Sequence, residues 1–250
     1  MIKLVVLDVD GCLTGGEAKP WDFGVFSYIA RLNRGARAGK EPFAVTLCTG
    51  RQEPYVEAFM QGIESHLPAI YENGAGLYFP APYRFAEHPD ISPAQRKSWL
   101  EIRRILIEQI AAPGIGIVQP GKESTFSLYP AQPSITLADL GESARASLGS
   151  ALDGYVLFVS RTTVEILPEG IDKGAGLAWL ARETGISTAD IAGIGDSNAD
   201  LAYLMKVGTS AAPANAVPEV RARVHYVSPY EDSRGVKDIL DRWRKLISRP

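Results

Sequence analysis

Two aspartates lie near the start of the chain, directly after a short apolar run. Asp8 and Asp10 belong to Asp8-Val-Asp-Gly-Cys-Leu-Thr14, and the residues before them, from position 3, read Lys-Leu-Val-Val-Leu. Parallel sheets bind ligands beyond the carboxyl ends of their strands. A carboxylate there is costly to bury unless a cation or hydrogen-bond donors face it, and Mg²⁺ prefers oxygen ligands. The pair therefore favours a Mg²⁺ site, the alternative being an ordinary Asp10-Gly11 surface turn.

A second acidic segment repeats this arrangement late in the chain. Ile194-Gly-Asp-Ser-Asn-Ala-Asp200 follows another apolar run, with Asp196 in the predicted loop and Asp200 in the first turn of the next helix. Both acids can reach a site at the same sheet edge. For Asp200 an ordinary helix cap is an equally simple interpretation.

Two further segments supply groups suited to an anion. In Leu47-Cys-Thr-Gly-Arg51, the Thr49 hydroxyl and nearby backbone N–H groups could hold a phosphate oxygen. Lys173 opens a predicted helix and offers a positive charge to a phosphate and an attacking carboxylate. Taken singly, a Thr-Gly pair is common in loops, and a lone lysine is usually solvated.

The elements around these segments alternate between buried strands and helices. Apolar runs predict strands over 3–9, 43–47, 69–71 and 191–194, and helical stretches over 23–32 and 176–183 separate them. This alternation predicts an α/β fold, a doubly wound core with a parallel sheet. The glycine-bearing segment from Gly35 to Gly39 is expected to be a flexible loop.

The middle of the chain has a different character, which predicts an inserted α+β domain. A capping box at Ser92–Gln95 opens a helix with one apolar stripe. A β-hairpin is predicted from two strand-like runs, 155–159 and 164–167. We expect a core made of residues 1–80 and 168–250 and an inserted cap of residues 81–167. The segment Lys122-Glu-Ser-Thr125 and Arg161 flank strands of this insertion and could face a substrate, but they are expected on its solvated rim.

Composition excludes several classes of protein. The 250 residues carry 26 basic and 29 acidic side chains, a formal charge of −3, which provides no basic field for nucleic acid or an anionic membrane. No apolar run is long enough to span a membrane. The two cysteines, Cys12 and Cys48, form no disulfide framework and no zinc pattern, so a reducing, cytoplasmic location is expected. Oligomeric state is not visible in the sequence.

The four chemical segments, taken in order, resemble the signature of the haloacid dehalogenase-like hydrolase superfamily. That signature is Asp-x-Asp, then Ser or Thr, then Lys, then an acidic pair. The similarity extends to Glu72-Asn-Gly-Ala75, to 165–174 and to Ala214-Asn-Ala216. The position of the insertion resembles the large-cap branch, which contains Cof-type sugar phosphatases, sucrose-phosphate phosphatase and archaeal phosphoglycolate phosphatase.

The resemblance implies a Mg²⁺-dependent phosphatase acting on a small phosphorylated metabolite through an aspartyl-phosphate. It makes Asp8 the nucleophile and Asp10 the general acid and base, with Thr49 and Lys173 holding the transferring phosphoryl group. The implied metal ligands are Asp8, the backbone carbonyl of Asp10 and Asp196, supported by Asp200. The implied phosphate-binding residues are Gly11, Thr49, Gly50, Arg51 and Lys173.

Two departures from the family pattern and three alternatives remain. Cys12 stands where the family usually has Thr, and Asn198 is displaced by one position, although Asp200 keeps its register.

A phosphotransferase or phosphomutase would pass the phosphoryl group to a second hydroxyl instead of water. A receiver-like signalling module also forms an aspartyl-phosphate, but the insertion and the position of Asp8 on the first strand count against it. A non-catalytic metabolite-binding protein is disfavoured because every charged catalytic position is filled.

Overall fold

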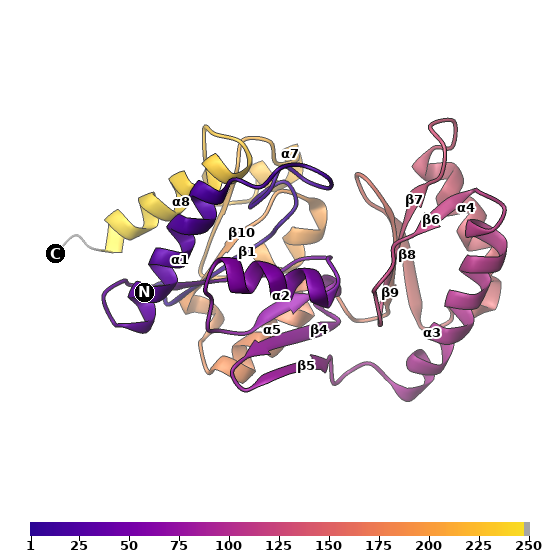
Figure 1. Cartoon of the computed structure of the whole chain (residues 1–250), viewed down its shortest axis with the longest axis horizontal. Helices are drawn as coiled ribbons and strands as arrows, with labels where there is room; N and C mark the ends of the chain where they lie inside the picture. The colour runs from indigo at the N-terminus through magenta and orange to yellow at the C-terminus, as the bar shows by residue number, and fades with distance from the viewer. Residues whose placement is uncertain (248–250) are drawn as a thin grey trace. The chain divides into compact units, whose positions relative to one another are not determined.

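The computed structural model describes residues 1 to 247. They form two compact units. The first contains Met1–Ala86 and the chain from Asp172 onward, and the second contains Glu87–Ile171. In Figure 1 the first unit carries both ends of the colour range and the second carries its middle. Each unit has its own cluster of buried apolar side chains.

The first unit is built on a parallel sheet whose strand order is β12-β11-β10-β1-β2. The strands are β1 (Leu4–Leu7), β2 (Ala44–Leu47), β10 (Ile191–Ile194), β11 (Thr209–Ala212) and β12 (Tyr226–Val227). Alternate residues of β1 belong to different apolar clusters, Val5 and Leu7 to one and Leu4 and Val6 to the other. A strand covered on both faces needs apolar residues at every position, which is the pattern of this run.

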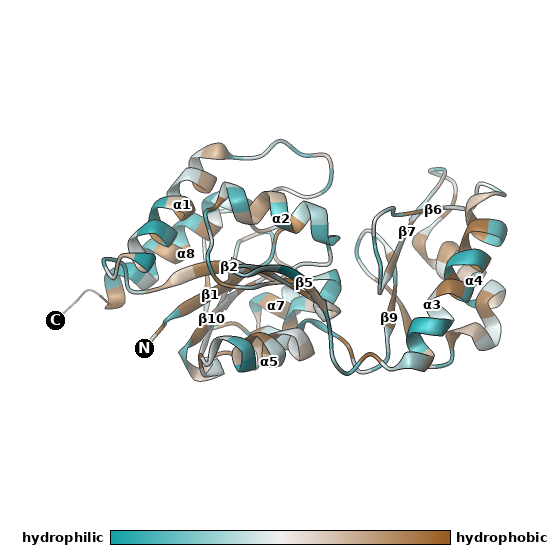
Figure 2. Cartoon of the chain, turned by 60° about the horizontal axis from the view of Figure 1, so that its bottom comes forward, coloured by the Kyte–Doolittle hydropathy of each residue, from teal (hydrophilic) through white to brown (hydrophobic). Residues whose placement is uncertain are grey.

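Helices cover both faces of this sheet. One face is covered by α1 (Phe23–Arg37), α2 (Glu53–Gly62) and α8 (Asp232–Ile247). The other is covered by α5 (Lys173–Thr184), α6 (Leu201–Leu204) and α7 (Pro218–Arg221). Figure 2 shows α1 and α2 on one side of the sheet and α5 and α7 on the other. These three layers are a doubly wound α/β fold, as the sequence predicts.

One local prediction was wrong, because α1 continues through Gly35 to Arg37. The last turns of the helix are tied to β2 by the buried side chain of Asn33. Its Nδ2 donates to the carbonyl of Val45 at 3.1 Å, and its Oδ1 accepts from the N–H of Val45 at 2.7 Å. These tertiary contacts outweigh the low helix propensity of glycine.

The chain next forms a small antiparallel sheet in the order β3-β4-β5. Its strands are β3 (Ala69–Tyr71), β4 (Gly76–Pro80) and β5 (Tyr83–Glu87). The predicted strand over 69–71 is present, but it pairs along its length with β4 and meets the end of β2 only through a parallel bridge between Cys48 and Ile70. This bridge brings the turn after β3 next to the loop after β2.

The second unit is an α+β layer with a sheet in the order β6-β7-β9-β8. Its strands, β6 (Gly116–Val118), β7 (Phe126–Pro130), β8 (Tyr155–Val159) and β9 (Val164–Pro168), are antiparallel to their neighbours. Two helices, α3 (Pro93–Ile105), extended by a π-helical turn over Leu106–Ala111, and α4 (Leu137–Leu148), supply the rest of its core. The predicted capping box is confirmed, because Gln95 N–H donates to Ser92 Oγ at 3.2 Å and Ser92 N–H donates to Gln95 Oε1 at 2.8 Å. A role for this unit in substrate specificity stays a prediction.

Candidate active site

The predicted site residues lie just beyond the ends of three neighbouring strands. Asp8 follows β1, Thr49 follows β2, and Asp196 follows β10 after Gly195. The N–H of Asp8 continues the ladder by donating to the carbonyl of Ile194 at 2.9 Å. Since β1 lies between β2 and β10, the sheet itself brings these three side chains to one edge.

Three buried carboxylates and one ammonium group lie at this edge, and two of the carboxylates, those of Asp8 and Asp200, accept from the ammonium group. Asp8, Asp196, Asp200 and Lys173 are each at most 5% exposed. Lys173 Nζ donates to Asp8 Oδ1 at 2.8 Å and to Asp200 Oδ1 at 2.6 Å. With all three acids ionised, the cluster has an excess of negative charge. Burial, and then the charge of Asp200, raise the pKa of Asp8 well above its ordinary value, although Lys173 opposes the shift.

Lys173 stays protonated in this environment. Burial by itself lowers the pKa of a lysine, but the charges of Asp200 and Asp8 outweigh it and raise the pKa of Lys173. Lys173 is the first residue of α5, where Asp172 caps the helix by accepting from the N–H of Ala175 at 2.7 Å. The helix start therefore places the ammonium group in the carboxylate cluster.

The residues of this cluster fit a hard divalent cation. Ligand atoms of Asp8, Cys12 and Asp196 all lie within 4.8 Å of one another. The two carboxylates are the kind of ligand that Mg²⁺ prefers, and a divalent cation would neutralise their excess charge. Burial and the charge of Asp196 raise the pKa of Cys12. Its Sγ donates to Asp196 Oδ1 at 3.8 Å, so the thiol contacts one of the two carboxylates.

The turn after β1 passes close to Asp196 because of Gly11. Gly11 has a φ of +82°, and a Cβ built there would lie 2.4 Å from Asp196 Oδ2. The carbonyl of Gly11 accepts from Asn215 Nδ2 at 2.8 Å, and Asn215 Oδ1 accepts from the N–H of Asp232 at 2.9 Å. Asn215 thus connects the turn after β1 to the start of α8. No role of its own was predicted for this asparagine from the sequence.

Asp10 is held by an arginine from the loop after β2. Arg51 Nε donates to Asp10 Oδ2 at 2.6 Å, and Arg51 Nη2 donates to Asp10 Oδ1 at 2.7 Å. The guanidinium group also lies over the ring of Tyr55, 4.7 Å from its centre. Burial lowers the pKa of Arg51, but the hydrogen bonds and charge of Asp10 outweigh it, and the net shift is upward. From the sequence, Arg51 was expected to bind phosphate, and its bidentate pair with Asp10 was not predicted.

The loop from Thr49 to Arg51 is fixed by two residues with left-handed backbones. Glu72 N–H donates to the carbonyl of Arg51 at 2.9 Å, and Asn73 N–H donates to the carbonyl of Thr49 at 3.0 Å. Glu72 and Asn73 have φ values of +46° and +55° and are both buried. The Asn73 amide also lies close to Gly50, and a Cβ built there would be 3.0 Å from its nitrogen and oxygen. Strained backbones of this kind persist where the surrounding structure over-determines them, often at functional sites.

Asp200 supports the loop that carries Asp196. Asp200 Oδ2 accepts from the N–H of Asp196 at 3.1 Å and from the N–H and hydroxyl of Ser197, each at 2.8 Å. Its other oxygen accepts from Lys173. Both oxygens therefore have protein donors, which suits the supporting role, and direct coordination of metal by Asp200 stays a prediction. Asn198 is exposed and lies in the short 3₁₀ turn Asn198–Asp200.

The fold and this arrangement of strand-end carboxylates, hydroxyl and lysine can be compared with known families. Residues 136–240 match the family model of the haloacid dehalogenase-like hydrolases, the group that the four sequence segments resemble.

Two relatives and one solved structure match nearly the whole chain. It is 29% identical to a phosphoglycolate phosphatase of Methanopyrus kandleri, over 99% of this chain and 98% of that protein. It is 25% identical to phosphoglycolate phosphatase 1 of Saccharolobus solfataricus, over 98% and 97% of the two chains. A crystal structure of protein 0175 of Thermoplasma acidophilum has the same fold, with a TM-score of 0.73 at 22% identity over 97% of this chain and 98% of that one.

No helix within residues 1–247 combines the length and the hydropathy that a membrane crossing requires.

Proposed function

We propose that the chain is a Mg²⁺-dependent phosphatase that hydrolyses a small phosphorylated metabolite through an aspartyl-phosphate on Asp8. The observation that carries the proposal is the buried cluster of Asp8, Asp196 and Asp200, in which Lys173 donates to Asp8 and to Asp200. The relatives named as phosphoglycolate phosphatases match this chain from end to end, which makes phosphoglycolate the first substrate to test, followed by sugar phosphates.

The carboxylates of Asp8 and Asp196 and the backbone carbonyl of Asp10 are the groups that would hold Mg²⁺. When bound, the ion supplies positive charge to the oxygens of the transferring phosphoryl group. Lys173 and the loop of Thr49 and Gly50 supply further positive charge and hydrogen-bond donors to the same oxygens. In phosphoryl transfer such positioning and charge neutralisation account for most of the catalysis.

The reaction then proceeds in two displacements. An oxygen of Asp8, which Lys173 orients through Oδ1, attacks phosphorus while the bond from phosphorus to the leaving oxygen breaks. Asp10 passes a proton to that leaving oxygen, and the dephosphorylated product departs. A water molecule then gives a proton to Asp10 and attacks phosphorus, which releases inorganic phosphate and restores the Asp8 carboxylate.

The ion pair between Asp10 and Arg51 must open for this proton transfer. Both carboxylate oxygens of Asp10 are engaged by the guanidinium group, so the aspartate can reach a leaving oxygen only after a change of partner. A phosphate group offers Arg51 the same bidentate geometry as a carboxylate. Binding of substrate can therefore exchange Asp10 for phosphate on Arg51, and the freed Asp10 carboxylate takes up a proton from solvent before it acts as an acid.

The first test is Asp8→Asn. This change keeps the size of the side chain and removes the nucleophile, so we expect Mg²⁺-dependent hydrolysis of p-nitrophenyl phosphate and phosphoglycolate to fall by about 10³-fold or more. Asp190→Asn is the matched control, because Asp190 lies at the surface and pairs with the N-terminus and Lys3. Wild-type turnover by folded Asp8→Asn protein would refute the assignment.

Two labelling measurements separate the alternatives. Hydrolysis in ¹⁸O-labelled water puts the label into inorganic phosphate, whereas transfer to a second hydroxyl leaves the released products unlabelled. A receiver-like module would take up about one phosphoryl group per chain from acetyl phosphate and would then not turn over with phosphorylated metabolites.

A further inference from the structure

Arg51 has two partners in the candidate active site, and the proposed reaction makes different demands on them. Asp10 accepts from its Nε and Nη2, and the ring of Tyr55 lies against the guanidinium group, with 4.7 Å between the guanidinium carbon and the ring centre. Asp10 must leave this arrangement before it can act as an acid. The ring can stay, because an aromatic face attracts the cation while the N–H donors remain free for other acceptors.

The ring of Tyr55 is held by other aromatic side chains of the first unit. Tyr55 lies in the first turn of α2, and its ring centre is 4.6 Å from that of Phe59, a fully buried residue one turn further along. Trp21, which precedes α1, lies nearly perpendicular to the Tyr55 ring at 6.2 Å and stacks on Phe26 at 5.4 Å. Such aromatic contacts add to the stability of the packing. The ring therefore has support that remains when Asp10 leaves.

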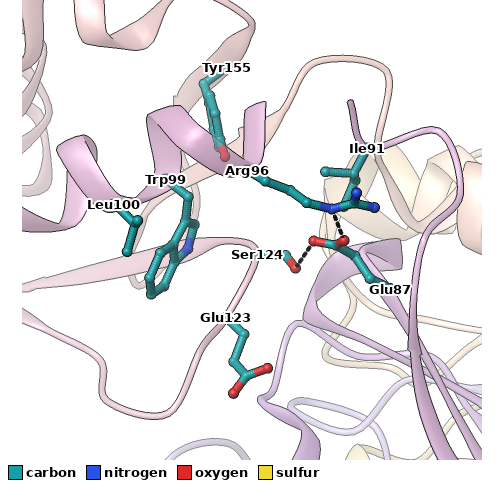
Figure 3. A pocket seen from close by; sticks show the side chains of 8 residues that line it. All are labelled: Glu87, Ile91, Arg96, Trp99, Leu100, Glu123, Ser124 and Tyr155. Carbon is teal, nitrogen blue, oxygen red and sulfur yellow. Dashed lines mark hydrogen bonds and ion pairs between the residues drawn. The ribbon is translucent and has the colours of Figure 1, made fainter. Parts of the chain in front are cut away.

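Arg96 in the second unit provides a contrast, because its ion pair has no ring beside it. Figure 3 shows Arg96 paired with Glu87. In the described part of the chain Arg96 makes no cation–π contact, whereas Arg51 does. The Arg96 side chain is also 50% exposed, and that of Arg51 is 11% exposed. Arg96 would lose its orientation without Glu87, but Arg51 would keep a surface to lie on if Asp10 left.

We propose that Tyr55 is a positioning residue that keeps Arg51 oriented toward the substrate phosphate while Asp10 is released. The inference rests on the proposed function, because that function supplies both the phosphate and the need to release Asp10. Tyr55 itself is assigned no contact with the reacting atoms and acts through Arg51. A side chain that is held in its binding geometry loses less freedom when the ligand arrives, so the ring strengthens the binding of phosphate groups.

Kinetics of Tyr55 variants of the full chain test this role. Tyr55→Leu keeps an apolar side chain and removes the ring, so we expect the KM for p-nitrophenyl phosphate and the inhibition constant of inorganic phosphate to rise about tenfold. The kcat should change by less than about twofold, since the lost support acts on the bound substrate as well as on the transition state. Tyr55→Phe keeps the ring and should restore the wild-type values.

Two comparisons separate this role from a general loss of packing. Tyr226→Leu removes a ring that lies 4.4 Å from the guanidinium carbon of Arg242, on β12 at the sheet edge opposite β2, and should leave both constants unchanged. Arg51→Met removes the cation, and adding Tyr55→Leu to it should raise the KM no further, because the ring acts through Arg51. Additive effects in this double-mutant cycle would overturn the proposal, and so would a wild-type KM in Tyr55→Leu.

A measurement that needs no turnover distinguishes failure of this inference from failure of the proposed function. The ¹⁵N heteronuclear NOE of Arg51 Nε reports how rigid the guanidinium group is. In Asp10→Ala we expect Arg51 to stay more ordered than Arg96, and to become as mobile as Arg96 when Tyr55→Leu is added. Equal order with and without the ring would overturn the positioning role. A wild-type protein without phosphatase activity would instead refute the proposed function, and with it the need to release Asp10, even if the ring holds Arg51 as expected.

Discussion

Replacing Gly11 with alanine tests how closely the turn after β1 fits the side chain of Asp196. The new Cβ would lie 2.4 Å from Asp196 Oδ2, and the carboxylate must retreat until the separation reaches at least 3.0 Å. The left-handed backbone at φ +82° adds strain of about 1–2 kcal/mol for a residue with a side chain. We therefore expect both a loss of stability and a displaced metal ligand.

Gly39→Ala separates these two effects. Gly39 also has a left-handed backbone, at φ +67°, but nothing lies within 4 Å of the Cβ that alanine would add. Both variants should lose about 1–2 kcal/mol in urea unfolding. Only Gly11→Ala should bind Mg²⁺ more weakly by calorimetry and lose activity, by on the order of 100-fold, because displacements well below 1 Å already disturb catalytic geometry. Equal activity in the two variants would refute the proposed contact between Gly11 and the metal ligand.

Three further changes test the surroundings of the site. Lys173→Met leaves the carboxylates of the cluster without their cation, so we expect a loss of about 3 kcal/mol in denaturant unfolding together with loss of turnover; unchanged stability would contradict the buried pairing. Asn73→Ala should be less stable than Asn73→Gly by about 1 kcal/mol, because only glycine adopts the left-handed backbone without strain; the reverse order in thermal unfolding would contradict this reasoning. Burial raises the pKa of Asp8, so a proton competes with Mg²⁺ for its carboxylate. The affinity for Mg²⁺, measured by calorimetry, should therefore fall as the pH is lowered from 8 to 6. An affinity independent of pH would argue against Asp8 as a ligand.

The sequence was a good guide to the fold and to the strand-end residues of the site. Asp8, Thr49 and Asp196 could be found because each follows an apolar run, and strand ends in a parallel sheet meet at one edge. Lys173 could be found because it opens a predicted helix and stands between the Thr49 segment and the Asp196 segment, which is the place of the lysine in the signature that the chain resembles. Their catalytic roles stay predictions, which the substitutions above can test.

Other features depend on contacts that a linear pattern does not contain. Asn73 and Asn215 lie in segments that the resemblance includes, but they act through backbone groups brought close by the fold, so their contacts could not be predicted from residue type or spacing. Lys122 was expected on a solvated rim, and this prediction was wrong: the side chain is buried, donates to Ser127 Oγ and lies 3.7 Å from Glu165. Buried charges become acceptable when such partners surround them, and the partners lie on other strands.

The strand order also determines when each part of the protein can acquire its structure during synthesis. β1 pairs with β10, with Leu4 opposite Ile191, so the central ladder of the first unit cannot close until most of the chain has left the ribosome. The second unit contains all the partners of its own four strands and can close its ladders earlier. A nascent chain ending near residue 171 should therefore hold a folded insertion and an apolar β1 that has only β2 as a neighbour, which leaves an open strand edge prone to aggregation until the C-terminal third arrives.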